Sequence, residues 1–92
     1  MQLRWSPAAA DDLERIVTHI RQDSPEAAQR VASMLDGGVG RRGDHPHSGR
    51  PGRVDGTREL VYPSLPFVAV YRVTPEAVEI TRILHERQRW PE

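Results

Sequence analysis

The chain has 92 residues, of which 37% are hydrophobic, and 13 basic residues balance 13 acidic ones, so the formal net charge is zero. This length predicts one domain spanning residues 1–92, and the absence of cysteine excludes disulfides and thiolate metal sites and favours a reducing cytoplasm. Residues 1–5 lack the apolar core of a signal peptide and no run is long enough to span a bilayer, so we expect a soluble cytoplasmic protein without a membrane partner.

All 13 basic residues are arginine, and they are unevenly distributed. Residues 1–40 carry four arginines against six acids, whereas residues 41–92 carry nine against seven. A GC-rich genome explains the preference for arginine more simply than phosphate binding does, although the guanidinium group suits phosphate well. The basic C-terminal half still indicates a mildly cationic face for an anionic ligand.

Two helix starts follow a short first strand, which we expect at residues 1–5. Ser6 and Pro7 are typical of an N-cap and a first helical position, and the same pair recurs at Ser24 and Pro25. After each start, apolar side chains follow at i, i+3, i+4 and i+7, which predicts one apolar stripe per helix. Two such helices with a short link should form an antiparallel hairpin.

The second helix is expected to end near Gly37. Four glycines fall between residues 37 and 43, and each costs about 1 kcal/mol relative to alanine inside a helix. A loop rich in turn residues should follow through residues 44–52.

Three strands are expected in the rest of the chain, because the apolar period changes to two. They lie at residues 57–62, 67–73 and 78–85, which are rich in β-branched and aromatic residues and are separated by short turns. Such short links require an antiparallel meander. The sequence therefore predicts an α+β fold of the order βααβββ, with the helical hairpin packed on one face of a small antiparallel sheet.

The segment at residues 49–61 combines glycines with arginines that project from a loop leading into a strand. Two interpretations of Arg50, Arg53 and Arg58 stand on equal terms. The arginines form a cationic edge for a nucleic acid, or they staple the loop, with Arg58 and Glu59 in ion pairs across neighbouring strands.

The last strand and the tail interleave arginines with a histidine and an aromatic ring, which suits phosphate contacts and base stacking. His85 is a candidate proton donor or acceptor at neutral pH. For Trp90 we favour a role in closing the edge of the core over base stacking. Alternation places Arg82 and His85 on opposite faces of a regular strand, so they share one site only if a bulge or the strand end intervenes.

Common catalytic motifs are absent from the sequence: there is no phosphate-binding glycine loop, no HExxH and no nucleophile elbow. His45 and His47 lack a thiolate or a nearby acidic cluster, so we interpret them as solvated loop residues. No metal and no cofactor are expected.

In combination, five segments resemble the RelE/ParE superfamily of toxins from bacterial type II toxin–antitoxin systems, in the right order and over nearly the whole chain. They are WSPAA at 5–9, DSPEAA at 23–28, GRPGRVDGTREL at 49–60, PFVAVYRV at 66–73 and VEITRILHERQRWP at 78–91. The resemblance implies the same βααβββ fold. It also implies a cognate antitoxin protein that wraps the toxin and often carries a domain for operator DNA. The chain departs from the family pattern at residues 37–43, where relatives continue the second helix with an aliphatic stripe.

The resemblance implies growth inhibition, for which our first hypothesis is a RelE-like endoribonuclease that cuts mRNA on the ribosome without a metal. Arginines then stabilise charge on the scissile phosphate and a histidine transfers the proton. The catalytic candidates are Arg58, Arg72, Arg82 and His85, and the candidates for nucleic-acid binding are Arg50, Arg53, Arg89 and Trp90.

Two alternatives remain open at this point. ParE-like members share the scaffold but inhibit DNA gyrase by binding, and the chain lacks the lysine-rich sheet surface and terminal tyrosine typical of RelE-like enzymes. The third hypothesis is an inactive relative that is kept as an antitoxin partner.

Overall fold

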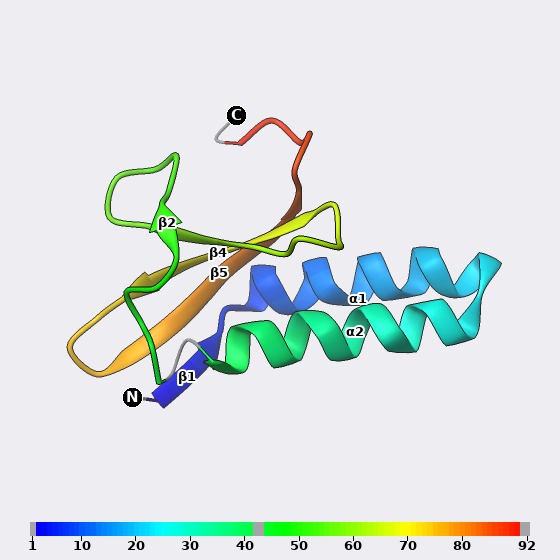
Figure 1. Ribbon diagram of the computed structural model, residues 1–92, viewed down its shortest axis with the longest axis horizontal. Coiled ribbons are helices and arrows are strands. Elements are labelled where there is room, and N and C mark those ends of the chain that lie inside the picture. Colours follow the sequence, from blue (N-terminus) through cyan, green and yellow to red (C-terminus); the bar gives the residue numbers. More distant parts are fainter. Residues whose placement is uncertain (1, 42–43, 91–92) are drawn as a thin grey trace.

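The computed structural model describes residues 2–41 and 44–90 and has two layers (Figure 1). One layer is a hairpin of two helices, α1 (Pro7–Asp23) and α2 (Pro25–Gly40), and the other is a five-stranded sheet with the order β1-β5-β4-β3-β2. The strands are β1 (Gln2–Trp5), β2 (Arg50–Pro51), β3 (Arg58–Val61), β4 (Phe67–Val73) and β5 (Ala77–His85). The hairpin covers one face of the sheet, which confirms the predicted α+β architecture. None of the described helices is both long and apolar enough to cross a membrane.

Each helix begins after the serine that the sequence predicts as its cap. The Ser6 Oγ accepts a hydrogen bond from the Ala9 N–H at 3.1 Å, and the Ser24 Oγ accepts one from the Ala27 N–H at 3.1 Å. Ser24 also ends α1, so a single residue links the two helices. Because the chain must reverse there, the helices lie antiparallel and side by side.

The predicted end of the second helix near Gly37 is wrong, because α2 continues past it for almost a full turn. Long-range packing holds this extra turn. The Val39 side chain is fully buried, and the Tyr62 hydroxyl donates a hydrogen bond to the Leu35 carbonyl at 2.8 Å. Gly38 permits the close approach, since a side chain at this position would collide with the Tyr62 ring. Tertiary contacts therefore outweigh the low helix propensity of the glycines.

The sheet contains the predicted antiparallel meander, formed by β3, β4 and β5. Two features go beyond it. β1, whose predicted residue 1 lies outside the described residues, pairs in parallel with β5, so the sheet is mixed. The two-residue β2 adds an edge beside β3, with Arg50 opposite Glu59. Parallel neighbours need a long connection, and the intervening helices and strands provide it here.

A β-bulge in β5 changes the direction of its side chains at Thr81. Val70 of β4 lies opposite Arg82, whereas the next β4 residue lies opposite Ile80, so Thr81 is the extra residue. As a result, Ile80 and Ile83 both pack into the core under the helices, although their spacing is odd. The bulge precedes Arg82, and the pairing from Arg82 to His85 is regular, so the bulge does not bring these two side chains to one face of the sheet.

Candidate functional site

The four predicted catalytic residues are spread along the sheet. Arg72 lies near the end of β4, and His85 lies opposite the first residue of this strand, about 17 Å away at the usual rise per residue. Arg58 lies on β3 next to the Arg72 end. Arg82 and His85 instead line the same hollow of about 310 Å³. The structure thus brings Arg82 and His85 together at one hollow. Arg58 and Arg72 lie outside it.

Arg58 and Arg72 each bond to neighbouring parts of the chain. The exposed Arg72 donates to the Glu79 Oε1 from Nε at 2.9 Å, and its Nη2 lies 2.8 Å from the same oxygen. Arg58 donates from Nη1 to the carbonyl oxygens of His47 at 3.0 Å and Gly49 at 2.9 Å. Both arginines therefore have structural partners at their own positions on the sheet.

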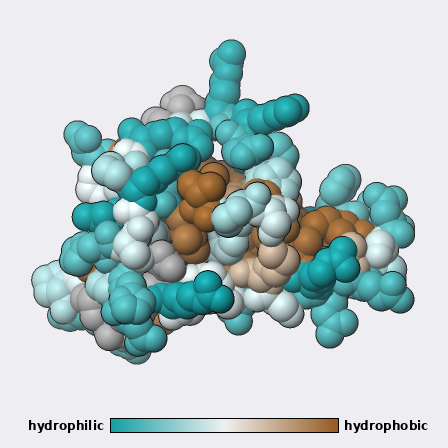
Figure 2. Space-filling view, viewed as in Figure 1, coloured by the Kyte–Doolittle hydropathy of each residue, from teal (hydrophilic) through white to brown (hydrophobic). Residues whose placement is uncertain are grey.

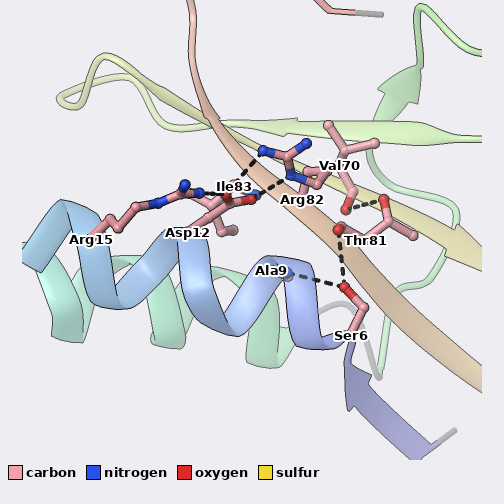
Figure 3. A network of polar contacts seen from close by, with 8 residues as sticks. All are labelled: Ser6, Ala9, Asp12, Arg15, Val70, Thr81, Arg82 and Ile83. Carbon is pink, nitrogen blue, oxygen red and sulfur yellow. Dashed lines mark hydrogen bonds and ion pairs between the residues drawn. The ribbon is translucent and has the colours of Figure 1, made fainter.

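A buried carboxylate on α1, Asp12, holds Arg82 (Figure 3). Asp12 is 3% exposed, and its Oδ2 accepts hydrogen bonds from the Arg82 Nε at 2.7 Å and from the Ile83 backbone N–H at 2.9 Å. Its Oδ1 accepts from the Arg82 Nη2 at 3.0 Å and from Arg15. Each Asp12 oxygen therefore accepts two hydrogen bonds. The contact with Arg82 is bidentate, which is among the stronger polar contacts in proteins.

These contacts close the outer edge of β5 beyond the point where β1 ends. Ser6 donates from its backbone N–H to the Ile80 carbonyl at 2.9 Å and from its Oγ to the Thr81 carbonyl at 3.0 Å. Asp12 then takes the Ile83 N–H, as Figure 3 shows. The first turns of α1 thus satisfy backbone groups that a neighbouring strand would otherwise pair.

Arg82 also contacts the C-terminal tail. Its guanidinium carbon lies 5.3 Å from the centre of the Trp90 ring, within the range of a cation–π contact. Trp90 is half-buried, and its Nε1 is buried without an acceptor among the described residues. Arg89, beside it, is exposed. Arg82 therefore ties the tail and α1 to the end of β5, while the predicted nucleic-acid roles of Arg89 and Trp90 stay predictions.

His85 is exposed at the end of β5. Its ring meets the Phe67 ring edge-on, with 5.8 Å between the centroids and 85° between the planes. The Nδ1 accepts a hydrogen bond from the Arg87 backbone N–H at 3.1 Å. Since a neutral imidazole carries one proton, this assigns the proton to Nε2 and makes that atom a donor.

A second buried carboxylate, Glu59 on β3, collects the arginines of the preceding loop. Glu59 is 2% exposed, and its Oε1 accepts from the Arg50 Nη2 at 2.8 Å. Its Oε2 accepts from the Arg53 backbone N–H at 3.0 Å and lies 3.4 Å from the Arg53 Nε. These are the contacts of an arginine-stapled loop, and the nucleic-acid role of Arg50 and Arg53 stays a prediction.

The environment of Glu59 changes its acidity. Burial acts to raise the pKa of this carboxyl group, but the hydrogen bonds from the Arg53 backbone and the Arg50 side chain, together with both charges, outweigh burial. The pKa therefore lies below its usual value, and Glu59 is ionised in the folded protein at neutral pH.

Asp12 and Glu59 are buried carboxylates that were not predicted as functional residues from the sequence. For Asp12 a signal exists, because it lies three residues after the buried Ala9 and four before Ile16, on the core-facing side of α1. For Glu59 no local signal exists, since its partners become neighbours only when β2 pairs with β3.

Apolar side chains also remain on the surface of the helical hairpin. Figure 2 shows hydrophobic surface along the helices and between the helices and the sheet, bordered by hydrophilic residues. One groove of about 610 Å³ is lined by Trp5, Leu13 and Val17 among others, with Arg21 and Asp36 beside them. Such a surface is typical of a site for a protein partner.

No group of three histidine, cysteine or acidic side chains that could hold a metal ion occurs within residues 2–41 and 44–90. His45 and His47 are both exposed there. The expected independence from metals and cofactors stays a prediction.

Comparison with known proteins places this geometry in a family. The model of the ParE toxin family, described as the ParE toxin of the type II toxin–antitoxin system parDE, matches residues 3–90. Y4kP of Sinorhizobium fredii, which is named as a toxin, is 38% identical over 91 residues, covering 99% of this chain and 94% of that protein. Toxin RelE2 of Caulobacter vibrioides is 38% identical over 84 residues, covering 91% and 93%. The structure titled "Chromosomal ParDE TA system from P. aeruginosa" superposes with a TM-score of 0.83 at 32% identity, covering 92% of this chain and 95% of that one.

The fold and the matches together define the class: this is the toxin component of a type II toxin–antitoxin module, with an antitoxin as its partner. Within the RelE/ParE superfamily, the chain belongs to the ParE toxin family.

Proposed function

We propose that this toxin inhibits growth in the cytoplasm by binding DNA gyrase, as ParE-like toxins do, and that it does not cleave RNA. The observation that carries the proposal is the separation of the predicted catalytic arginines. Arg58, Arg72 and Arg82 bond to three different parts of the chain, and each has carboxylate or carbonyl partners of its own.

Phosphodiester cleavage needs cationic donors at about 3 Å from one phosphate, arranged before the reaction begins. Arg72 lies about 17 Å along β4 from Phe67, which contacts His85, and alternation directs the Arg72 side chain to the opposite face of the sheet, so the two side chains do not converge on one phosphate while the strands are paired. Recognition of a protein target needs no such convergence. The match of the ParE family model over residues 3–90 favours the same mechanism.

One observation favours the endoribonuclease hypothesis as a second candidate. Arg82 and His85 line a common hollow, and the neutral His85 ring presents a proton on Nε2. A small active site built on these two residues would leave Arg58 and Arg72 without a catalytic role.

Two assays with the purified toxin distinguish the candidates. The first measures supercoiling of relaxed plasmid by gyrase, and the second measures cleavage of a reporter mRNA on programmed ribosomes. We expect the toxin to inhibit supercoiling in proportion to its concentration, antitoxin to reverse the inhibition, and the mRNA to remain intact.

The opposite pattern would overturn the proposal. It consists of normal supercoiling and a cleaved mRNA, with cleavage abolished in His85→Ala and retained in Arg72→Gln. Arg72 is a suitable control because its exposed ion pair contributes only about 0–1 kcal/mol to stability.

A further inference from the structure

The hollow between α1, the end of β5 and the tail has the character of an anion-binding site. Its walls come from the apolar side chains of Ile16, Phe67 and Ile83, and its polar lining consists of Asp12, Arg15, Arg82, His85 and Gln88. We propose that this hollow, which we call the anion pocket, receives one carboxylate side chain of the antitoxin. The proposal concerns the antitoxin and does not depend on whether the target is gyrase.

Arginines outnumber acids among the described residues that line the anion pocket. Asp12 is the one acid among the described residues that line it, and it faces the guanidinium groups of Arg15 and Arg82. Both Asp12 oxygens already accept two hydrogen bonds each, from Arg15, Arg82 and the Ile83 N–H. This carboxylate has no further capacity, so the other donors of the mostly exposed Arg15 remain for a second anion.

The pocket lining offers several hydrogen-bond donors to such an anion. The Arg15 side chain is 71% exposed, and a guanidinium group carries five N–H donors, of which the bond to Asp12 uses one. His85 offers its Nε2 proton because its Nδ1 is occupied by the Arg87 N–H. Gln88 adds a side-chain amide to the lining. Arginine and histidine donors around one small space suit a two-oxygen anion.

Size and charge favour a carboxylate from a protein over a nucleic-acid backbone. The pocket holds about 310 Å³ and is walled partly by Phe67 and Ile16, which suits one acidic side chain with its methylene groups. Nucleic-acid binding relies on several phosphate contacts and the release of counterions, whereas the pocket presents one mostly exposed guanidinium group, that of Arg15, and the chain has no net charge. Asp11 and Glu14 are exposed on α1 next to Arg15, where they would repel a polyanion.

The test measures the affinity of the full-length antitoxin for purified toxin variants, with unfolding curves to verify that each variant is folded. Arg15→Gln and His85→Gln each remove one donor from the pocket. Arg30→Gln is the matched control, since it removes an exposed arginine from α2, which does not line the pocket. We expect Arg15→Gln to raise the Kd about ten-fold, which corresponds to one lost charge-assisted bond, and Arg30→Gln to change the Kd less than two-fold.

A charge-reversal pair locates the carboxylate itself. Arg15→Glu should bind antitoxin more weakly than Arg15→Gln does. When antitoxin acids are changed to lysine one at a time, a single position should restore binding to the Arg15→Glu toxin. If Arg15→Gln and His85→Gln bind antitoxin as tightly as Arg30→Gln does, the proposal is wrong. The proposal is also wrong if these variants keep their affinity for antitoxin but lose binding to gyrase or to a short RNA. The anion pocket would then bind the cellular target rather than the antitoxin.

Discussion

Arg82 bonds to α1 through Asp12 and stacks on Trp90 of the tail, so it connects two segments to the end of β5. Its removal would leave Asp12 buried with part of its hydrogen bonding lost, which is among the costlier changes a fold can suffer. Loss of toxicity on substituting Arg82 therefore reports on the fold as much as on chemistry. Substitutions at the exposed Arg15, Arg72 and His85 separate the two effects better.

Glu59 supports a prediction about stability and pH. Glu59→Gln keeps the size of the side chain but removes the charge that Arg50 and Arg53 neutralise, so the free energy of unfolding should fall by about 2 kcal/mol at pH 7. The folded-state pKa lies below the reference value of 4.5, so the carboxylate stabilises the fold fully above this value. The contribution is lost as the pH falls through the folded-state pKa. Urea denaturation of both proteins between pH 7 and pH 3 measures the difference.

The control for this prediction is Glu79→Gln, which breaks the more exposed ion pair with Arg72. It should cost less than about 1 kcal/mol. A Glu59→Gln variant that is as stable as Glu79→Gln at pH 7, or a difference from wild type that grows in acid, would contradict the account.

At the residue scale, the sequence predicted the positions with local signals. The serine caps Ser6 and Ser24 are examples, whereas for the arginines of residues 49–61 the sequence left a stapled loop and a cationic edge equally open. It did not predict the hydrogen bonds between Asp12 and Arg82, because these residues are 70 positions apart and meet only when α1 crosses the edge of β5. The bulge at Thr81 also has no local signature, and it lies before both Arg82 and His85 rather than between them.

At the scale of elements, α2 offers a matched pair of substitutions. Gly37→Ala places a methyl group in open space and should stabilise the protein by about 0.5–1 kcal/mol through helix propensity. Gly38→Ala brings the same gain in propensity, but its methyl group meets the Tyr62 ring, and the strain should lower stability by about 1–3 kcal/mol. Thermal unfolding of the two variants beside wild type gives the comparison directly.

Equal stabilisation by both alanines would mean that α2 does not lie against Tyr62. The extra turn of α2 would then lack the packing against Tyr62 that explains it. This length is what local reasoning missed: the glycine-rich segment predicted an early end, and burial of Val39 decided otherwise. The parallel pairing of β1 was likewise out of reach, because it depends on the path of the whole chain rather than on the pattern of residues 2–5.

At the scale of the whole molecule, some of the 13 arginines and 13 acids pair with each other within the chain. Arg50, Arg53 and Arg82 pair with the two buried carboxylates, and Arg72 pairs with Glu79 on the sheet. Four of the nine arginines in the basic C-terminal half are therefore engaged in ion pairs within the chain itself. These ion pairs reduce the cationic surface that a nucleic acid would use, which favours the proposed binding of a protein target.

The most direct test of this account follows DNA and protein synthesis in cells that are induced to express the toxin without its antitoxin. Incorporation of labelled thymidine and of a labelled amino acid is measured over the first minutes after induction. The account predicts that thymidine incorporation stops first and DNA-damage signalling follows, while amino-acid incorporation continues. An early stop of amino-acid incorporation with cleaved transcripts, while DNA synthesis continues, would contradict it.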